Sequence, residues 1–427
     1  MLSNDYNKQY DRRQRIKKTT LVVGLDIGSD FNAVGFMNKD GNVLGRLAKM
    51  DNSRKGFDQF VRTTEDLKAK HGLKDVLIGL EPTGHYWRKI AFFAMDRGYG
   101  VRFIRTTSVK HERELNESSS AKSDPRDALT LTNLTREGKY IDTVIEDGVS
   151  RQLRTLSKVR EKISRQNTGA KNMLHAVLDD YFPELKELFY AMNTKGLWAV
   201  LENCPFPEDV LKFKKTALAD IITKASWRKT DGVRKAAALY LAAETSIGLK
   251  RVSDADRYRL TVCLNEVKRT ERMLQEIKKE MKELLKHLPA SQYLLSIPGV
   301  GHLSAAIFLG ELGNPSYFHH AKQIIKYAGY DPQESDSGKR IGRKVISKKG
   351  RWLLRKCLFL MSVRAVKHSR FFQKYYQRRL KNKNRFGQLL KKKEALCAVA
   401  IKLIKVIFAL LRDKREFQDT VSFALAA

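Results

Sequence analysis

The chain has 427 residues and a formal net charge of +35, from 82 Lys and Arg against 47 Asp and Glu. A charge this large destabilises a compact fold unless a polyanion neutralises it, so it favours a nucleic-acid partner over a merely basic protein such as a ribosomal factor. The hydrophobic fraction of 42% is enough for two or three domains with cores of their own.

Targeting and redox signals are few. Residues 1–18 are a polar, charged segment without the apolar centre of a signal peptide. The most apolar late stretch, residues 396–411, carries Lys402 and Lys405, which predicts a buried helix and no membrane span. Four cysteines lie far apart without a CxxC pair, which argues against a zinc site or a disulfide framework. We therefore expect a cytoplasmic protein.

Residues 19–145 have an α/β pattern. Apolar, β-branched runs over 20–26 and 75–81 predict buried strands that end at Asp26 and Glu81. Between them we expect a hairpin (32–37 and 42–48, with the turn 38–41) and a helix over 53–71. A helix over 85–97, a strand over 100–104 and a helix from Asp124 follow. This order predicts an RNase H-like mixed sheet with one acid on the first strand and another on the fourth.

Four carboxylates carry the chemistry that we expect of this region. Asp26 and Glu81 end strands, while Asp124 and Asp127 lie three residues apart on one face of a helix. Such a cluster repels itself unless cations bind it, and carboxylate oxygens suit Mg²⁺ or Mn²⁺. Two such ions about 4 Å apart are a common device for cutting phosphodiesters. Taken singly, Asp124 is equally well explained as a helix cap before Pro125.

Residues 146–290 are helix-rich. Leu153, Leu156, Val159 and Ile163 recur at helical spacing, and residues 260–288 follow a rough 4-3 spacing that Glu271 and Lys278 interrupt. The pattern predicts an imperfect coiled coil, antiparallel or between chains, with an ordinary amphipathic helix pair as the alternative. Residues 181–250 form an inserted helical lobe to which we assign no chemistry.

Residues 291–427 form a third, mostly helical and very basic unit. No Asp or Glu occurs in residues 337–393, although a solvated basic face normally contains some acids. We expect this span to contact phosphates. The cations that we predict to bind nucleic acid are Lys339, Arg340, Arg343, Lys348, Lys349 and Arg351. Aromatic residues are interleaved with them, and we expect Trp352 and Phe359 to belong to the core.

Two motifs in this unit have chemical interpretations. Ser296-Ile-Pro-Gly-Val-Gly301 has the sequence of a helix-hairpin-helix, in which Gly299 and Gly301 would bring backbone N–H groups to a phosphate. A plain helix corner is the alternative. Ser337 lies in a polar loop beside Lys339 and Arg340, where cations can stabilise an attacking alkoxide. By position alone it is an ordinary turn serine, and Ser335 and Ser347 compete with it.

These motifs together resemble the DEDD-type insertion-sequence transposases of the IS110 family, which includes the pilin-gene invertase Piv. The likeness covers about residues 19–140 and 291–415, in the family's order. The motifs that carry it are Val23-Gly-Leu-Asp-Ile-Gly28, Leu80-Glu-Pro-Thr-Gly84, Lys122-Ser-Asp-Pro-Arg-Asp-Ala128, Ile297-Pro-Gly-Val-Gly301, Tyr327-Ala-Gly-Tyr-Asp-Pro332, Ser337-Gly338 and Ile346-Ser-Lys-Lys-Gly350. The longer polar N-terminus and the large middle insertion depart from the family's pattern.

The resemblance implies a RuvC-like domain (residues 19–145) after a polar tail (1–18), then a coiled coil with its lobe (146–290) and a C-terminal transposase domain (291–427). It also implies that Asp26, Glu81, Asp124 and Asp127 hold Mg²⁺ and that Ser337 is a covalent nucleophile. The implied partners are donor and target DNA and a noncoding bridge RNA. We expect a homodimer that forms a tetramer in the synaptic complex, in a bacterial or archaeal cytoplasm at the nucleoid.

Three functions therefore stay open on the sequence. The first is a DNA recombinase that uses the acids and a serine. The second is a RuvC-like junction-resolving endonuclease that uses water, or a site-specific DNA invertase. The third is a nucleic-acid scaffold without catalysis, against which the four intact acids argue. No Gly-x-x-x-x-Gly-Lys-Ser/Thr loop occurs, so strand exchange would conserve phosphodiester bond energy without ATP.

Overall fold

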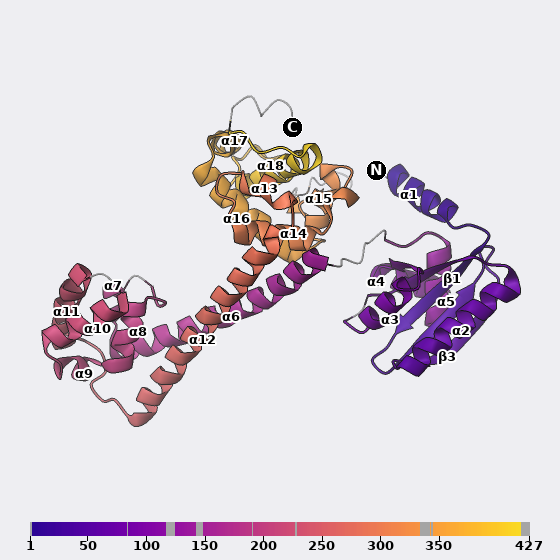
Figure 1. Cartoon of the computed structure of the whole chain (residues 1–427). Helices are drawn as coiled ribbons and strands as arrows, with labels where there is room; N and C mark the ends of the chain where they lie inside the picture. The colour runs from indigo at the N-terminus through magenta and orange to yellow at the C-terminus, as the bar shows by residue number, and fades with distance from the viewer. Residues whose placement is uncertain are drawn as a thin grey trace. The chain divides into compact units, whose positions relative to one another are not determined.

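The computed structural model describes residues 2–82, 84–116, 124–141, 148–189, 191–226, 229–333, 342 and 345–419. The chain divides into two compact units, Met1–Ile145 and Glu146–Ala427. Figure 1 shows a mixed sheet with helices in the first unit and helices throughout most of the second. Each unit is described in turn.

The first unit is built on a five-stranded sheet. Its strands are β1 (Thr20–Ile27), β2 (Phe31–Met37), β3 (Val43–Asp51), β4 (Asp75–Leu80) and β5 (Gly100–Phe103). They lie in the order β3-β2-β1-β4-β5. The hairpin strands β1, β2 and β3 pair antiparallel, whereas β1, β4 and β5 pair parallel. The sequence predicted all five strands.

Helices cover both faces of this sheet. They are α1 (Leu2–Arg15), α2 (Arg54–His71), α3 (Trp87–Met95), α4 (Thr106–Asn116) and α5 (Asp124–Arg136). Leu21, Val23 and Leu25 alternate into the core shared with α2 and α3, while Val22 faces the core that α5 completes. Burial on both faces explains why β1 is an almost continuous apolar run.

The polar N-terminal segment is a helix, whereas we expected a tail. Ile16 is buried at the end of α1, and Gln9 Nε2 donates to the carbonyl of Glu137 at 3.2 Å. The guanidinium of Arg12 lies 5.7 Å from the ring centroid of Tyr140. These contacts attach α1 to the end of α5, so residues 9–16 are part of the first unit's packing.

The second unit begins with two long helices, α6 (Gly148–Tyr181) and α12 (Asp254–Lys286). They pack against each other antiparallel within one chain (Figure 1). Buried Asn167 Nδ2 donates to Thr270 Oγ1 at 2.8 Å, and Lys171 pairs with Glu271 at 2.5 Å. Glu271, which interrupts the apolar spacing of the sequence, therefore has a cation opposite it on the partner helix.

Short helices between α6 and α12 form the inserted lobe. They are α7 (Leu185–Leu188), α8 (Lys195–Asn203), α9 (Pro207–Leu211), α10 (Lys215–Ser226) and α11 (Lys229–Glu244). Their core includes Phe182, Leu197 and Phe206 together with Leu260 of α12. The lobe is therefore packed onto one end of the helix pair.

The remaining elements surround the other end of the pair. They are α13 (Ala290–Leu295), α14 (His302–Leu312), the 3-10 turn η1 (Pro315–Tyr317), α15 (Ala321–Ala328), β6 (Pro332–Gln333), β7 (Val345–Ile346), α16 (Trp352–His368), α17 (Arg370–Leu380) and α18 (Lys392–Asp413). Leu153 of α6 and Met281 and Leu285 of α12 share one core with these helices. A domain boundary at residues 290–291 thus stays a prediction.

The apolar stretch within α18 is buried, with Lys402 only 9% exposed. None of the helices in the described ranges is both long enough and apolar enough to cross a membrane. Trp352, which we expected in the core, is 45% exposed and has the guanidinium of Arg165 5.2 Å from its ring centroid. Phe359 is half-buried.

Candidate active site

Two of the predicted acids lie at the ends of neighbouring parallel strands. Leu25 of β1 lies opposite Leu80 of β4 in the register; the next residues are Asp26, near the end of β1, and Glu81, directly after β4. Both are half-buried. Parallel neighbours end at the same edge of a sheet, so the register brings these two residues to that edge together.

A row of three glycines crosses the sheet just before this edge. Gly24 of β1 pairs with Gly35 of β2 and with Gly79 of β4. A Cβ at residue 24 would lie 2.5 Å from Thr132 Oγ1, and closer still to the backbone of α5 at Ala128 and Thr132. A Cβ at Gly35 or Gly79 would first meet the side chain of Thr132 or Thr135 of α5, respectively. The glycines therefore let α5 lie directly on the backbones of three strands.

The contact between α5 and the three glycines determines where α5 begins relative to the sheet. Ala128 lies over Gly24, whereas Leu134, two turns later, packs with Val22 nearer the start of β1. The first turn of α5 consequently points toward the edge where β1 and β4 end. Asp127 directly precedes Ala128, and its side chain is buried, with 4% exposed. Asp124 is the first residue of α5, and its side chain lies outside what the structure describes.

The predicted ligand set can be examined only in part, because the side chain of Asp124 is outside the described residues. Among the described side chains, no three His, Cys, Asp or Glu residues lie close enough together to hold a metal ion. The donors that the fold brings to this edge are all carboxylates, which fit a hard divalent cation in chemical type. The structure thus aligns the elements that carry Asp26, Glu81 and Asp127 without showing a metal site.

Two asparagines, which the sequence did not single out, fix the turn that follows Asp26. Buried Asn32 accepts a hydrogen bond from Gly28 N at 3.3 Å and donates to Asn52 Oδ1 at 2.7 Å. Asn52 in turn donates to the carbonyls of Gly28 at 3.1 Å and Ser29 at 2.9 Å. Asn32 is the polar residue of the otherwise apolar strand β2, and this could have marked it in the sequence, because a buried amide needs hydrogen-bond partners.

The loop that contains the predicted nucleophile is flanked by two short strands, β6 and β7, which pair with each other. Pro332 and Gln333 of β6 pair antiparallel with Ile346 and Val345 of β7. Ser337 lies between these strands, outside the described residues. So do the alternative Ser335 and the predicted phosphate ligands Lys339, Arg340 and Arg343.

Hydrogen bonds attach the β6–β7 strand pair to helices α15 and α16. Ser347 N donates to the carbonyl of Asp331 at 2.8 Å, and Arg355 Nη1 donates to the carbonyls of Ala328 and Lys348, both at 3.1 Å. Burial raises the pKa of Tyr330, whose hydroxyl donates to the carbonyl of Arg355 at 3.1 Å. Tyr330 therefore serves as a buried structural group, and Arg355 is an organiser of the loop that sequence motifs missed.

Ser347, the third serine considered, is half-buried at the end of β7. Its Oγ accepts a hydrogen bond from Lys349 N at 3.3 Å. Lys348 and Lys349 are both exposed beside it. A serine hydroxyl engaged in a local turn of this kind is typical of loop structure.

The two glycines of the helix-hairpin-helix motif play different parts. Gly299 has φ +88°, and a Cβ there would lie 2.8 Å from the backbone carbonyl of Arg364 in α16. Gly301, at the start of α14, has open space around its Cβ position. Gly299 is therefore required for packing inside the protein, and Gly301 is the one that leaves its surroundings accessible.

Arg351 differs from the exposed lysines that precede it. Its guanidinium donates to the carbonyl of Glu311, lies 3.9 Å from the Glu311 carboxylate and stacks 4.6 Å from the ring centroid of Tyr327. Glu311 is itself buried. The side chain of Arg351 is thus held within the protein, while Lys348 and Lys349 face solvent.

Comparison with known proteins identifies the family. Residues 23–183 match the family model of DEDD transposases of the IS110 type, described as "Transposase". Residues 291–377 match a second model, described as "Transposase IS116/IS110/IS902 family". The first match contains all four predicted acids. The second contains the β6–β7 strand pair that flanks the Ser337 loop, and also the helix-hairpin-helix motif with Gly299.

Individual relatives extend over most of the chain. The transposase for insertion sequence IS1111A of Coxiella burnetii is 22% identical, over 82% of this chain and 79% of its own length. The insertion element IS110 43.6 kDa protein of Streptomyces coelicolor is 22% identical, over 75% and 78%. The pilin gene-inverting protein of Moraxella bovis is 31% identical over 131 residues, or 30% of this chain and 38% of its own. The chain belongs to the IS110 family of insertion-sequence transposases.

Proposed function

We propose that this protein is a DNA recombinase that cuts and exchanges strands of donor and target DNA through a metal site and a serine nucleophile. The observation that supports the proposal most is the packing of α5 against the glycines of β1, β2 and β4. Three register-matched glycines bring the first turn of that helix to the edge where β1 and β4 deliver Asp26 and Glu81. The net charge of +35 supports a polyanionic substrate.

An RNase H-like, RuvC-like fold for the first unit is part of this proposal. In its support, the strand order is β3-β2-β1-β4-β5, with only β2 antiparallel to both of its neighbours. Asp26 lies on the first strand and Glu81 directly after the fourth. The sequence suggested the same two positions for the acids.

Asp26, Glu81, Asp124 and Asp127 would hold Mg²⁺ or Mn²⁺. When bound, such ions polarise the scissile phosphate and lower the pKa of an attacking hydroxyl. The protein's own contribution is to fix the carboxylates on rigid elements. Asp26 is fixed by β1 and the Asn32–Asn52 hydrogen bonds behind it, and Asp127 by the contact of α5 with the glycine row.

Ser337 would attack the phosphorus through its Oγ. One P–O bond forms to the serine, and the bond to the DNA 3′ oxygen breaks, so a 3′ hydroxyl leaves and the 5′ phosphate stays linked to the protein. Attack by a 3′ hydroxyl of another strand then reverses the step and releases Ser337. The number of phosphoester bonds is conserved, which explains how strand exchange proceeds without a nucleotide cofactor.

Guidance by a bridge RNA and assembly into dimers and tetramers rest on family likeness. The acids belong to Met1–Ile145 and the Ser337 loop to Glu146–Ala427, which are separate compact units. The likeness to the pilin gene-inverting protein over 131 residues favours site-specific inversion as the second candidate. A water-using junction-resolving endonuclease is the third.

The acids are tested by Glu81→Gln, with Asp75→Asn as the matched control. Asp75 starts the same strand at its opposite edge and is exposed, with Lys17 3.8 Å away. Losing a metal ligand should slow strand cleavage by about 10²-fold or more, whereas the control should keep the normal rate. Normal cleavage by Glu81→Gln would remove the acid site from the proposal.

The serine is tested by trapping the protein–DNA adduct on denaturing gels. Ser337→Ala should abolish the adduct and strand exchange while DNA affinity and folding persist, because a loop serine contributes little stability. Ser335→Ala and Ser347→Ala are the controls, and loss of the adduct in one of them would reassign the nucleophile. If the wild-type protein cuts DNA without any adduct, the water-using endonuclease becomes the better function.

A further inference from the structure

A small β-hairpin joins α17 to α18. Lys383 and Leu389 form an antiparallel bridge across it, and Asn384 N donates to the carbonyl of Gln388 at 2.7 Å. Asn384 Oδ1 accepts hydrogen bonds from Phe386 N at 2.9 Å and Gln388 N at 3.1 Å. Gly387 adopts φ +74°, the left-handed conformation that such a turn needs. The tip is therefore a built turn with a fixed shape.

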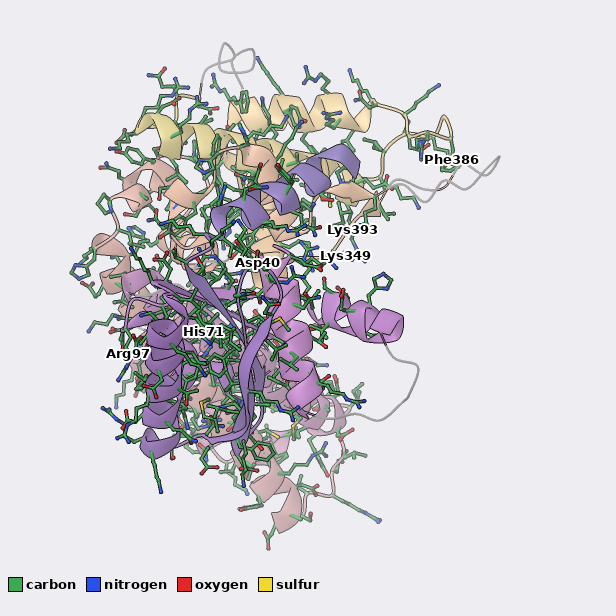
Figure 2. All side chains as sticks on the ribbon, turned by 90° about the vertical axis from the view of Figure 1, so that its right-hand side faces the viewer. Asp40, His71, Arg97, Lys349, Phe386 and Lys393 are labelled. Carbon is green, nitrogen blue, oxygen red and sulfur yellow. The ribbon has the colours of Figure 1, made fainter. Side chains whose placement is uncertain are left out.

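The hairpin presents large apolar side chains to solvent. Phe386, at the tip, is 49% exposed, and Leu389 is 61% exposed. Figure 2 shows Phe386 on a loop that projects away from the helices of its unit. Single exposed apolar residues are common. Two of them on one hydrogen-bonded, protruding turn form an apolar surface that a partner could contact. The charge around this surface indicates which kind of partner it binds.

That surrounding charge is uniformly positive. The cations within and just after the hairpin, all exposed, are Lys381, Lys383, Arg385, Lys391, Lys392 and Lys393. The first acid after them, Glu394, accepts a hydrogen bond from Lys391 N at 2.8 Å, at the start of α18. Six cations without an interspersed acid repel one another strongly unless a polyanion lies among them.

Two further contacts place this surface in the unit. Lys381 also lines a shallow depression along α17, of about 380 Å³, with Gln373, Lys374, Gln377 and Arg378. Arg385 Nη1 donates to the carbonyl of Gly342, near the end of the Ser337 loop, at 3.3 Å. The hairpin thus connects a basic depression on α17 with the loop that carries the proposed nucleophile.

We propose that the hairpin of residues 381–391 holds an unpaired base of a DNA strand, with Phe386 stacked on the base and the surrounding cations on its neighbouring phosphates. An aromatic face binds any exposed base, and a basic track binds the backbone, which together are the features of single-strand binding. The inference rests on the proposed function, because strand exchange exposes unpaired bases next to the cut. DNA is the occupant because it is the substrate of that reaction.

The test measures binding of the full-length protein to a fluorescein-labelled oligothymidylate and to a duplex of equal length. Phe386→Ala should bind the single strand about 5- to 150-fold more weakly, the loss expected for one base–aromatic stack. Its duplex affinity should be unchanged. Phe386→Trp should retain single-strand binding, and its added tryptophan fluorescence should be quenched by the oligonucleotide. Tyr258→Ala is the matched control, because Tyr258 is an exposed aromatic of α12 in the same unit.

The outcomes separate the hairpin from the proposed function. The proposed role of the hairpin is refuted if Phe386→Ala binds single strands with wild-type affinity, or if the oligonucleotide does not quench Phe386→Trp. Duplex binding in the same experiments would still support the proposed recombinase. A wild-type protein that binds neither DNA overturns both. An oligouridylate that shows the Phe386 dependence when oligothymidylate does not would make RNA the occupant and refute the choice of DNA. Circular dichroism of each variant shows whether a loss reflects unfolding.

Discussion

The glycine row makes the Gly24→Ala variant the sharpest structural test of the active-site arrangement. A Cβ at residue 24 would lie 2.5 Å from Thr132 Oγ1, nearly 1 Å short of the 3.4 Å at which ordinary van der Waals contact begins. Its still closer neighbours are backbone atoms of Ala128 and Thr132, which cannot turn aside as a flexible side chain can. The whole helix must therefore move away from the sheet by about this distance.

Two consequences have measurable sizes. Overpacking of this kind costs about 1–3 kcal/mol, which should make the amides of α5 exchange about 5- to 150-fold faster in hydrogen exchange followed by mass spectrometry. The shift also moves Asp127 relative to Asp26. A displacement of about 1 Å at a catalytic group can lower the rate on the order of 10²-fold. Strand cleavage should fall by that factor while DNA affinity, which we propose to depend on the second unit's cations, is kept.

Gly45→Ala is the matched control. Gly45 lies in β3 of the same sheet, and its Cβ would meet the Leu67 side chain at ordinary distances, 3.6 Å to Cδ1 and 3.9 Å to Cδ2. This variant should exchange and cleave like the wild-type protein. If Gly24→Ala does the same, α5 does not rest on the glycine row as described, and the alignment of Asp127 with the strand ends loses its support.

Glu161→Gln should loosen the attachment of α6 to α16 by about 1–3 kcal/mol in urea unfolding at neutral pH, because Lys356 binds both Glu161 oxygens at 2.8 Å. Burial acts to raise the pKa of Glu161, but hydrogen bonds from Lys356 and Arg165 outweigh it and leave the pKa below its ordinary value. This stabilisation is therefore complete above the unfolded-state pKa and disappears as pH falls through the folded-state pKa, a loss that the Gln variant should lack. Replacing Lys348 and Lys349 together by Ala should flatten the slope of log duplex affinity against log salt by about 1.8, since each phosphate contact contributes about 0.9; an unchanged slope would place the contacts elsewhere. Chelation of divalent metal should stop cleavage and spare duplex binding, and added Mg²⁺ or Mn²⁺ should restore it; cleavage that persists in chelator would exclude a metal-dependent site.

Much of the first unit was predictable because its signals are local. The runs that end at Asp26 and Glu81 are buried on both faces, so their apolar continuity marks strands without knowledge of any neighbour. Ser53 begins α2 by accepting a hydrogen bond from Gly56 N, and Gly72 ends it in the left-handed conformation. Such cap residues act within one turn of chain, and the sequence shows them directly.

The contacts that align the site were not predictable in this way. Gly24, Gly35 and Gly79 have meaning only as a row, and the row exists only once the register of three strands is known. The same holds for Arg351, which the sequence grouped with phosphate ligands although Glu311 and Tyr327 hold it. Charge pattern shows where cations are dense, but it does not show which of them the fold already uses.

Three glycines of the family motifs, Gly24, Gly299 and Gly350, have the same structural role, which is to allow close packing. A Cβ at Gly24 would meet the backbone of α5, at Gly299 that of α16, and at Gly350 the backbone of Tyr327 and Gly329. Each lies within two residues of a position with a proposed part in catalysis or binding, and each lets a second element approach to backbone contact there. Motifs such as Gly-Leu-Asp and Pro-Gly-Val-Gly thus combine one reactive or ligand-binding position with the packing that fixes it. Asp26 placed on this fold without Gly24 would consequently keep its carboxylate chemistry and lose its alignment with α5.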